Sequence, residues 1–262
     1  MPTAPSEDRL LSLDAFRGFT MLLLISHGFG IFEAFKGQYA WANQFEHASW
    51  IGCTLWDLIQ PAFTFIVGVA MPIALARRAA PWRHVVWRAL VLIVLSNVLS
   101  NWGSTALLKL QLINVLCQIA LSYLLCYALL QLSFRAQVVA AVALGLALEP
   151  LIPLVTRLWT GSFLFFSAGW VLLAFAAFYW LIEIRVQRRW TFPLLVVGAN
   201  SIFIYAFSQV LRGWLSRGLA AFDGQQFAGL GAVGAIPHNI FVMLAMWGLC
   251  YWLYQRRIFF KI

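Results

Sequence analysis

Long apolar stretches follow one another along most of this chain, and short polar segments separate them. A helix needs about 20 mostly apolar residues to cross the hydrocarbon core of a bilayer. By that measure the hydropathy pattern predicts about eight membrane-spanning helices within a single domain, residues 1–262. The fifth is the weakest, because Glu149, Pro150 and Pro153 interrupt its end. The predicted spans cover residues 12–34, 54–76, 84–101, 110–132, 136–155, 163–184, 191–212 and 237–255.

The composition agrees with an all-α, polytopic transmembrane bundle. Hydrophobic residues make up 63% of the 262 and charged residues 10%, whereas a soluble domain is nearer half apolar and a quarter charged. The formal net charge is +9. In a soluble protein it would favour nucleic-acid binding, but here we assign the cations to topology and expect no nucleic-acid partner. The cysteine and histidine spacings predict neither a disulfide nor a metal site.

The basic residues predict the orientation, because cytoplasmic loops carry an excess of Lys and Arg. With both termini in the cytoplasm, twelve basic residues fall inside, five fall outside and Arg17 lies within the first helix. His47 then lies in the first extracytoplasmic loop, residues 35–53. A second long outer loop, rich in glycine, is predicted at 213–236. The N-terminal apolar run is interpreted as a retained first helix.

One face of the second predicted helix is polar. Thr54, Asp57, Pro61, Thr64 and Gly68 recur at steps of three and four residues. We expect this face to point into the bundle, because ionisable groups at membrane depth are costly and usually functional. Thr54 and Thr64 can also serve as interhelical hydrogen-bonding groups, with Gly68 permitting close packing. Asp57 is the member that we assign to a site.

The first predicted helix is polar at both ends. Ser12 is a candidate N-cap, and the spacing of Asp14 and Arg17 allows an ion pair on one face. Arg17 either completes that interfacial pair or contacts an anionic cofactor that enters from the cytoplasm. Near the outer end, Ser26 and His27 are candidate site residues, although a lone interior histidine is commonly structural.

Polar residues of other predicted helices together suggest an interior polar cavity, although each can be a hydrogen bond between helices. His238 opens the last helix from the outside, either as a cap-like structural group or as part of a site. The other members are Ser96, Asn97, Ser100, Asn101, Gln111, Asn114, Gln118, Asn200, Ser201, Tyr205, Ser208 and Gln209.

Two segments are specific: RLLSLDAFRG (9–18) and HASWIGCTLWDLIQPAFTFIVGVAMPIAL (47–75). They resemble the heparan-α-glucosaminide N-acetyltransferase family and its bacterial relatives, which are transmembrane acyltransferases. Supporting matches are LINVLCQIALSYLL (112–125), LWTGSFLFFSAGWVLLAFAAFYWLIEI (158–184), FPLLVVGANSIFIYAFSQ (192–209) and MWGLCYWLYQRRIFFKI (246–262).

The resemblance implies transfer of an acetyl group from cytoplasmic acetyl-CoA to an amino-sugar or glycan acceptor across the membrane. His47 matches the family's catalytic histidine and would act as general base or acyl carrier, with Asp57 orienting or polarising the site. Asn200 would hydrogen-bond the thioester carbonyl. A homodimer and a location in a bacterial inner (plasma) membrane are also implied. The candidate residues for the acceptor are Ser26, His27, Trp50 and His238, and those for the cofactor phosphates are Arg17, Arg77, Arg78, Arg83 and Arg88.

Two alternatives stay open. Family members are longer, with extra helices where this chain has one weak span between residues 125 and 158. A scaffold shortened in this way could be a non-enzymatic transporter or lipid-handling protein, with no acetyl-CoA binding. It could also be an accessory subunit that needs a partner to complete its cavity. In every case we expect contact with membrane lipid.

Overall fold

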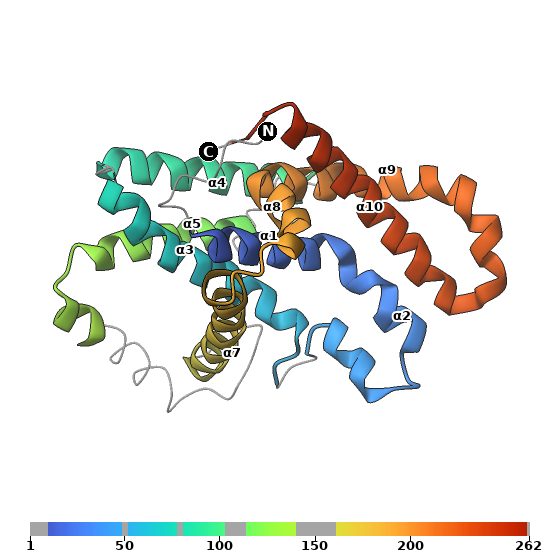
Figure 1. Ribbon diagram of the computed structural model, residues 1–262, viewed down its shortest axis with the longest axis horizontal. Coiled ribbons are helices and arrows are strands. Elements are labelled where there is room, and N and C mark those ends of the chain that lie inside the picture. Colours follow the sequence, from blue (N-terminus) through green and yellow to red (C-terminus); the bar gives the residue numbers. More distant parts are fainter. Residues whose placement is uncertain (1–9, 49–51, 78–80, 103–113, 140–160, 261–262) are drawn as a thin grey trace.

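The computed structural model describes residues 10–48, 52–77, 81–102, 114–139 and 161–260, and within them all regular structure is helical (Figure 1). Five helices are long and apolar enough to cross a membrane, or up to six if one bent pair forms a single span. The expected all-α transmembrane bundle is therefore confirmed, and the described residues supply five or six of the eight predicted spans.

Short helical segments adjoin several of the long helices in the described part of the chain. The helices are α1 (Leu11–Ser26), α2 (Ile31–Phe35), α3 (Ile59–Arg77), α4 (Trp82–Ser100), α5 (Val115–Leu130), α7 (Gly161–Tyr179), α8 (Phe192–Ala199), α9 (Ser201–Phe227) and α10 (Ala235–Gln255). The short segments are η1 (His27–Gly30), η2 (Ala40–Phe45), η3 (Trp56–Leu58), η6 (Trp180–Ile184), η7 (Arg189–Thr191) and η8 (Ala228–Gly234).

Most predicted spans correspond to observed helices. The first, second, third, sixth and eighth overlap the five long apolar helices, and the fourth overlaps the shorter α5. Most of the fifth predicted span, 136–155, lies outside the described residues.

The prediction of one continuous span over 191–212 is wrong. The chain bends by 67° between α8 and α9, and the bend is at Asn200. Its side chain is buried and binds the C-terminal segment, with Nδ2 donating to the carbonyl of Ile258 at 3.1 Å and Oδ1 accepting from the amide of Phe260 at 3.1 Å. The bend therefore serves a contact with residues far along the chain.

The prediction of an outer loop over 213–236 is also wrong. Helix α9 continues to Phe227, η8 follows, and α10 begins at Ala235. The glycines of this segment suggested a loop, but a glycine in a helix interior costs only about 1 kcal/mol relative to alanine. Packing of α9 against α10 is available to offset that cost.

The start of α1 is capped by a distant carboxylate. Ser12 is not the N-cap: its Oγ is buried and has no hydrogen-bond partner among the described residues. Instead, the Ser12 amide donates to Oε1 of Glu183 in η6 at 3.0 Å, and Glu183 also lies 3.6 Å from Arg188. A carboxylate suits the positive end of a helix, so this contact fixes α1 to the end of α7.

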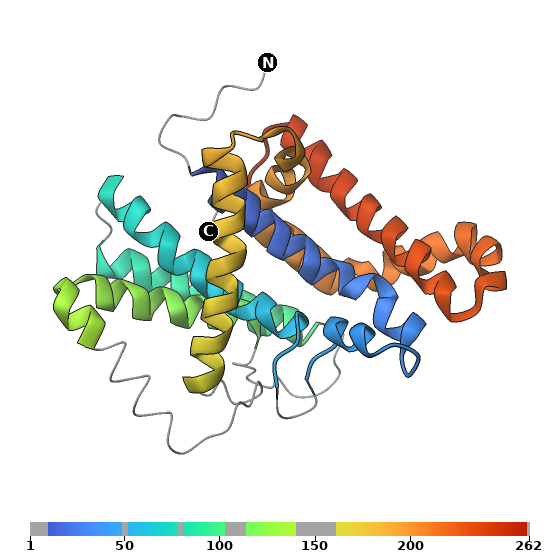
Figure 2. The same cartoon turned by 60° about the horizontal axis from the view of Figure 1, so that its bottom comes forward.

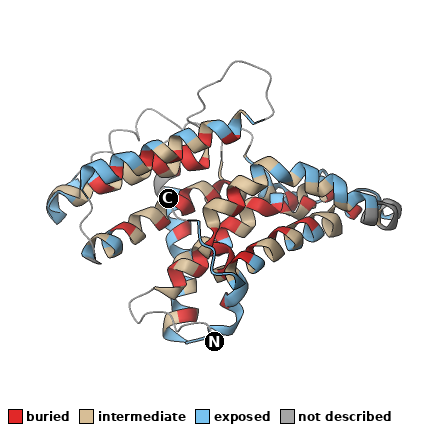
Figure 3. Ribbon diagram, turned by 90° about the horizontal axis from the view of Figure 1, so that it is seen from above, coloured by how far each residue is buried: buried red, intermediate tan, exposed pale blue. Residues whose placement is uncertain are grey.

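Helix α1 lies at the centre of the bundle (Figure 1) and packs against α3, α7, α8, α9 and α10. Helices α3, α4 and α5 form one side, whereas α9 and α10 form a hairpin on the other (Figure 2). Buried residues follow the faces where helices meet, and the outward faces are exposed (Figure 3). Large apolar side chains such as Val94, Leu173 and Trp214 are exposed there, as a lipid-facing surface requires.

The contact between α1 and α8 depends on two glycines. A Cβ built on Gly18 would lie 1.9 Å from the carbonyl oxygen of Leu194, and one on Gly198 would lie 2.7 Å from that of Asp14. Small residues allow helix backbones to approach closely in a membrane, where van der Waals packing drives association. No other residue type fits at Gly18 without moving the two helices apart.

We therefore expect Gly18→Ala to destabilise the protein by at least 1–3 kcal/mol, which is about the cost of overpacking a well-packed core. The matched control is Gly169→Ala, because an added Cβ at Gly169 meets nothing within 4 Å. The measurement is the midpoint of thermal unfolding in detergent, followed by size-exclusion chromatography. Equal midpoints for the two variants would contradict the close contact.

Candidate active site

The structure brings His47 and Asp57 together at the entrance to α3. His47 Nδ1 lies 2.7 Å from Asp57 Oδ1. The two side chains differ in exposure, since 56% of the His47 side chain is accessible and none of the Asp57 side chain is. A buried carboxylate therefore holds an imidazole that solvent can reach.

Asp57 is held in place by a set of donors. Its Oδ2 accepts hydrogen bonds from the amides of Ala48 (3.2 Å) and Thr54 (3.0 Å) and from Thr54 Oγ1 (3.0 Å). The Asp57 amide in turn lies 3.4 Å from Thr54 Oγ1, so the two residues form a reciprocal capping box at the start of η3. An ionised carboxylate is acceptor-only, so the proton between the pair belongs to Nδ1, and Nε2 carries the lone pair of the neutral ring.

The backbone around His47 is tied to the same turn. The His47 amide donates to Glu46 Oε1 at 3.1 Å, and Thr54 Oγ1 lies 2.7 Å from the Glu46 carbonyl. One turn away, the Leu55 amide donates to Gln44 Oε1 at 3.1 Å. The loop thus presents an exposed imidazole on a backbone that several hydrogen bonds fix.

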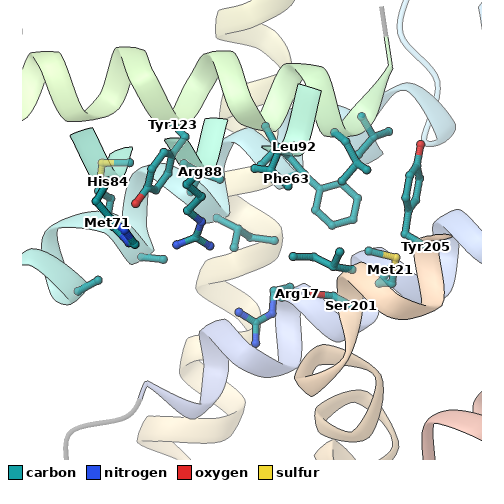
Figure 4. Close-up of a pocket in the computed structure, with 18 of the residues that line it drawn as sticks. Arg17, Met21, Phe63, Met71, His84, Arg88, Leu92, Tyr123, Ser201 and Tyr205 are labelled. Atoms are coloured by element: carbon teal, nitrogen blue, oxygen red, sulfur yellow. The ribbon is translucent and has the colours of Figure 1, made fainter. Parts of the chain in front are cut away.

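A cavity of about 640 Å³ lies between α1, α3, α4, α5 and α9 (Figure 4). Arg17, His84 and Arg88 line it together with many apolar side chains, and Ser201 and Tyr205 contribute polar groups from α9. The volume is in the range of small-molecule sites. Basic groups and an apolar wall suit a ligand with an anionic part and an uncharged part.

The two arginines of the cavity are held differently. Arg17 Nη2 forms the predicted ion pair with Asp14 Oδ1 at 2.9 Å, which confirms the pairing of these residues. The Arg88 guanidinium stacks over the ring of Tyr123 at 4.9 Å. Sequence reasoning missed His84 and Tyr123, although the four-residue spacing of His84 and Arg88 places both on one helix face.

Neither member of the His47–Asp57 pair lines this cavity. Asp57 precedes the lining residue Phe63 by six positions, which is about 9 Å along a helix axis. The pair therefore lies just before the start of α3, and the cavity begins further along that helix.

Other predicted site residues lie elsewhere. The Asn200 amide is used by the C-terminal segment, whereas its neighbour Ser201 lines the cavity. Arg83 is exposed on α4 and does not line it. Trp50 and Arg78 lie outside the described residues, as does the side chain of Arg77.

The remaining acceptor candidates lie near η1 and α10. Ser26 is buried and its Oγ donates to the Leu23 carbonyl at 2.7 Å. His27 is exposed and has a left-handed backbone, with φ of 48°. His238 Nε2 lies 2.8 Å from Ser216 Oγ on α9.

The polar face predicted for the second helix packs in part against α5. Ser122 Oγ lies 3.3 Å from Thr64 Oγ1, as an interhelical hydrogen bond requires. The expected role of Gly68 in close packing is wrong, because an added Cβ would make an ordinary contact of 4.0 Å with Cys126 Sγ. Within the described residues no group of three or more His, Cys, Asp or Glu side chains could hold a metal ion.

Comparison with known proteins places residues 9–164 under the family model described as heparan-alpha-glucosaminide N-acetyltransferase, catalytic. The human (Homo sapiens) protein of that name is 31% identical over 141 residues, which cover 50% of this chain and 20% of the human protein. The mouse (Mus musculus) protein is 32% identical over 103 residues, covering 37% of this chain and 14% of the mouse protein. The matched part of the chain thus covers a fifth or less of the length of these relatives. Helices α8 to α10 lie beyond residue 164.

Cys53 gives a chemical test of the turn that holds Asp57. Burial, and next the negative charge of Asp57, raise the pKa of the Cys53 thiol from 9.0 to about 11. Because the thiolate is the reactive form, we expect the rate of iodoacetamide labelling to keep rising through pH 10 instead of levelling near 9. Asp57→Asn removes the charge and is expected to lower the apparent pKa.

The rate is measured by mass spectrometry of the Cys53 peptide between pH 7 and 11. Glu33→Gln, which removes an exposed carboxylate on α2, is the control and should leave the profile unchanged. A labelling pKa at or below 9 in the unmodified protein would rule out the buried environment.

Proposed function

This chain belongs to the heparan-α-glucosaminide N-acetyltransferase family, and we propose that it moves an acetyl group from cytoplasmic acetyl-CoA to an extracytoplasmic amino-sugar or glycan acceptor. The observation that carries the proposal is the His47–Asp57 pair, which lies inside the region that the family model matches. The excess of basic residues on the predicted cytoplasmic side supports the direction of transfer.

His47 supplies the base in this proposal. Asp57 accepts the hydrogen bond from Nδ1–H, which leaves Nε2 of His47 to act as the base. Nε2 takes a proton from the acceptor amine while the amine nitrogen attacks the thioester carbonyl. The new N–C bond forms, the C–S bond breaks, and CoA leaves as the thiolate that takes up a proton. A neutral imidazole whose Nδ1–H is held by Asp57 presents the Nε2 lone pair that takes this proton. A route through acyl-imidazole would use the same Nε2 as nucleophile.

The cavity supplies the donor site. Arg17 and Arg88 would contact the donor's phosphates, because a guanidinium offers phosphate a planar fork of donors, and His84 adds a third polar group at the same cavity. The apolar wall suits the uncharged arm, which would extend along α3 toward the level of Asp57. Donor and acceptor would then meet where the cavity and the outer loop approach each other.

The first test is His47→Ala in protein reconstituted with labelled acetyl-CoA and amino sugars. We expect turnover to fall about 10²–10⁴-fold, the usual contribution of a general base, with little change in the KM for acetyl-CoA. Gln38→Ala is the matched control, because Gln38 is an exposed residue of the same loop. Equal turnover in His47→Ala would exclude His47 from the reaction.

The second test addresses the donor site through Arg88→Gln. Hydrogen bonds to charged groups contribute about 1.5–3 kcal/mol, so we expect the KM for acetyl-CoA to rise at least tenfold while kcat changes little. Arg88→Lys should recover part of the affinity, and Arg135→Gln, at an exposed arginine after α5, should have no effect. Absence of acetyl-CoA binding in the unmodified protein would instead favour the transporter or lipid-handling alternative.

A further inference from the structure

A second polar cluster lies where η1 and α9 each pack against α10. Its members on α9 and α10 lie beyond the region that the family model matches, whereas η1 lies within that region (Figure 1). Arg212 of α9 donates from Nη2 to Asn239 Oδ1 at 2.7 Å. One turn further along α9, Ser216 Oγ lies 2.8 Å from His238 Nε2. These side chains face one another across the α9–α10 hairpin.

The positive charge of Arg212 is not neutralised by an acidic side chain in the described part of the chain. The ion pairs found there involve Arg17, His47 and Arg188 as the basic members, and the partner of Arg212 is the neutral amide of Asn239. In addition, Arg212 Nε is buried without a hydrogen-bond partner among the described residues. A guanidinium within a membrane-spanning segment is costly unless it has an anionic partner. Within the described ranges Arg212 therefore lacks a neutralising partner, and its Nε–H is a donor that an anionic ligand could use.

The cluster also includes η1, whose backbone is left-handed throughout. His27, Gly28, Phe29 and Gly30 have φ values of 48°, 64°, 55° and 71°. Such a conformation is unfavourable for His27 and Phe29 and is kept only where surrounding contacts enforce it. A Cβ on Gly30 would lie 2.7 Å from Asn239 Nδ2, so the η1 backbone rests directly against the partner of Arg212.

The same turn contacts the loop that carries His47. A Cβ on Gly28 would lie 3.3 Å from the Cβ and carbonyl oxygen of Phe45, and Phe45 precedes His47 by two residues. His27 is the first residue of this turn. The candidate catalytic loop and the cationic cluster are therefore two neighbours of one short segment.

We propose that Arg212, with Asn239, binds a phosphate group carried by the acceptor, so that the acceptor is a phosphorylated amino sugar rather than a neutral one. This inference rests on the proposed acetyl transfer to an extracytoplasmic acceptor. The guanidinium offers phosphate a planar fork of donors, and charge-assisted bonds of this kind are among the strong ones. Asn239 already donates from Nδ2 to the carbonyl of Ala235 at 2.8 Å, so Arg212 supplies most of the binding.

Binding is tested on the full chain in nanodiscs of phosphatidylcholine, with glucosamine 6-phosphate and glucosamine as probes. We expect glucosamine 6-phosphate to raise the unfolding midpoint of the unmodified protein while glucosamine does not. Arg212→Gln should weaken the apparent affinity for the phosphate at least tenfold. Arg217→Gln is the control, because Arg217 is an exposed arginine of the same helix. Equal binding by unmodified protein and Arg212→Gln would overturn the proposal.

Asn239→Asp provides a second, nearly isosteric variant if Arg212→Gln does not fold. It places a carboxylate beside Arg212, which neutralises the guanidinium and repels phosphate, and it should also lose at least tenfold in affinity. Undiminished phosphate binding in Asn239→Asp would likewise overturn the proposal.

Turnover separates this inference from the proposed function. In the unmodified protein we expect the KM for glucosamine 6-phosphate to be at least tenfold below that for glucosamine, and Arg212→Gln should abolish the difference while leaving the KM for glucosamine unchanged. Arg212-dependent binding without acetyl transfer to any amino sugar would retain the phosphate site but overturn both the proposed function and the acceptor assignment. Stabilisation by phosphatidylglycerol, with no response to the sugar phosphate, would assign the cluster to a lipid headgroup and overturn the inference.

Discussion

The contact between α1 and α8 is the constraint on which the rest of the bundle depends. At Gly18 and Gly198 the two backbones approach so closely that neither position has room for a Cβ. Lipid tails are as apolar as the side chains that they surround, so van der Waals packing of this kind holds membrane helices together. Because α1 also contacts α3, α7, α9 and α10, this contact helps to fix Arg17 in the cavity at one end of α1 and the turn η1 against α10 at the other.

Much of the fold could be predicted, because a bilayer imposes both a length and a composition on each span. The failures occurred where distant contacts override the local pattern. Nothing near Asn200 marks it as a break, because its partners Ile258 and Phe260 lie 58 and 60 residues away along the chain. The same holds for the start of α1, where the cap comes from Glu183 rather than from the adjacent serine.

The candidate site was predictable to a similar degree. Helical spacing was enough to pair Asp14 with Arg17, and the resemblance to a family pointed to His47. The hydrogen bond between His47 and Asp57 could not be read from spacing, because the two residues are ten positions apart and do not belong to one helix. The Arg212–Asn239 contact was missed for another reason: the glycine content of the segment suggested a loop, so the face that Arg212 shares with Ser216 in α9 was not considered.

In the proposed reaction two polar substrates meet at a membrane, and the distribution of charge supports binding of both. Arg17 and Arg88 line the cavity on one side of the bundle. Arg212 belongs to the cluster beside η1, and η1 begins ten residues after Arg17, about 15 Å along the helix axis. Each guanidinium is partly shielded from water. Electrostatic attraction to an anion is stronger in such surroundings than in bulk solvent. The His47 ring needs no neighbouring cation. When the ring is protonated, the carboxylate of Asp57 balances its positive charge, and when the ring is neutral the pair carries one net negative charge. In the proposed reaction, binding energy would come from the cations of the cavity and of the cluster beside η1, whereas the reacting nitrogen would belong to the His47–Asp57 pair, whose imidazole is open to solvent.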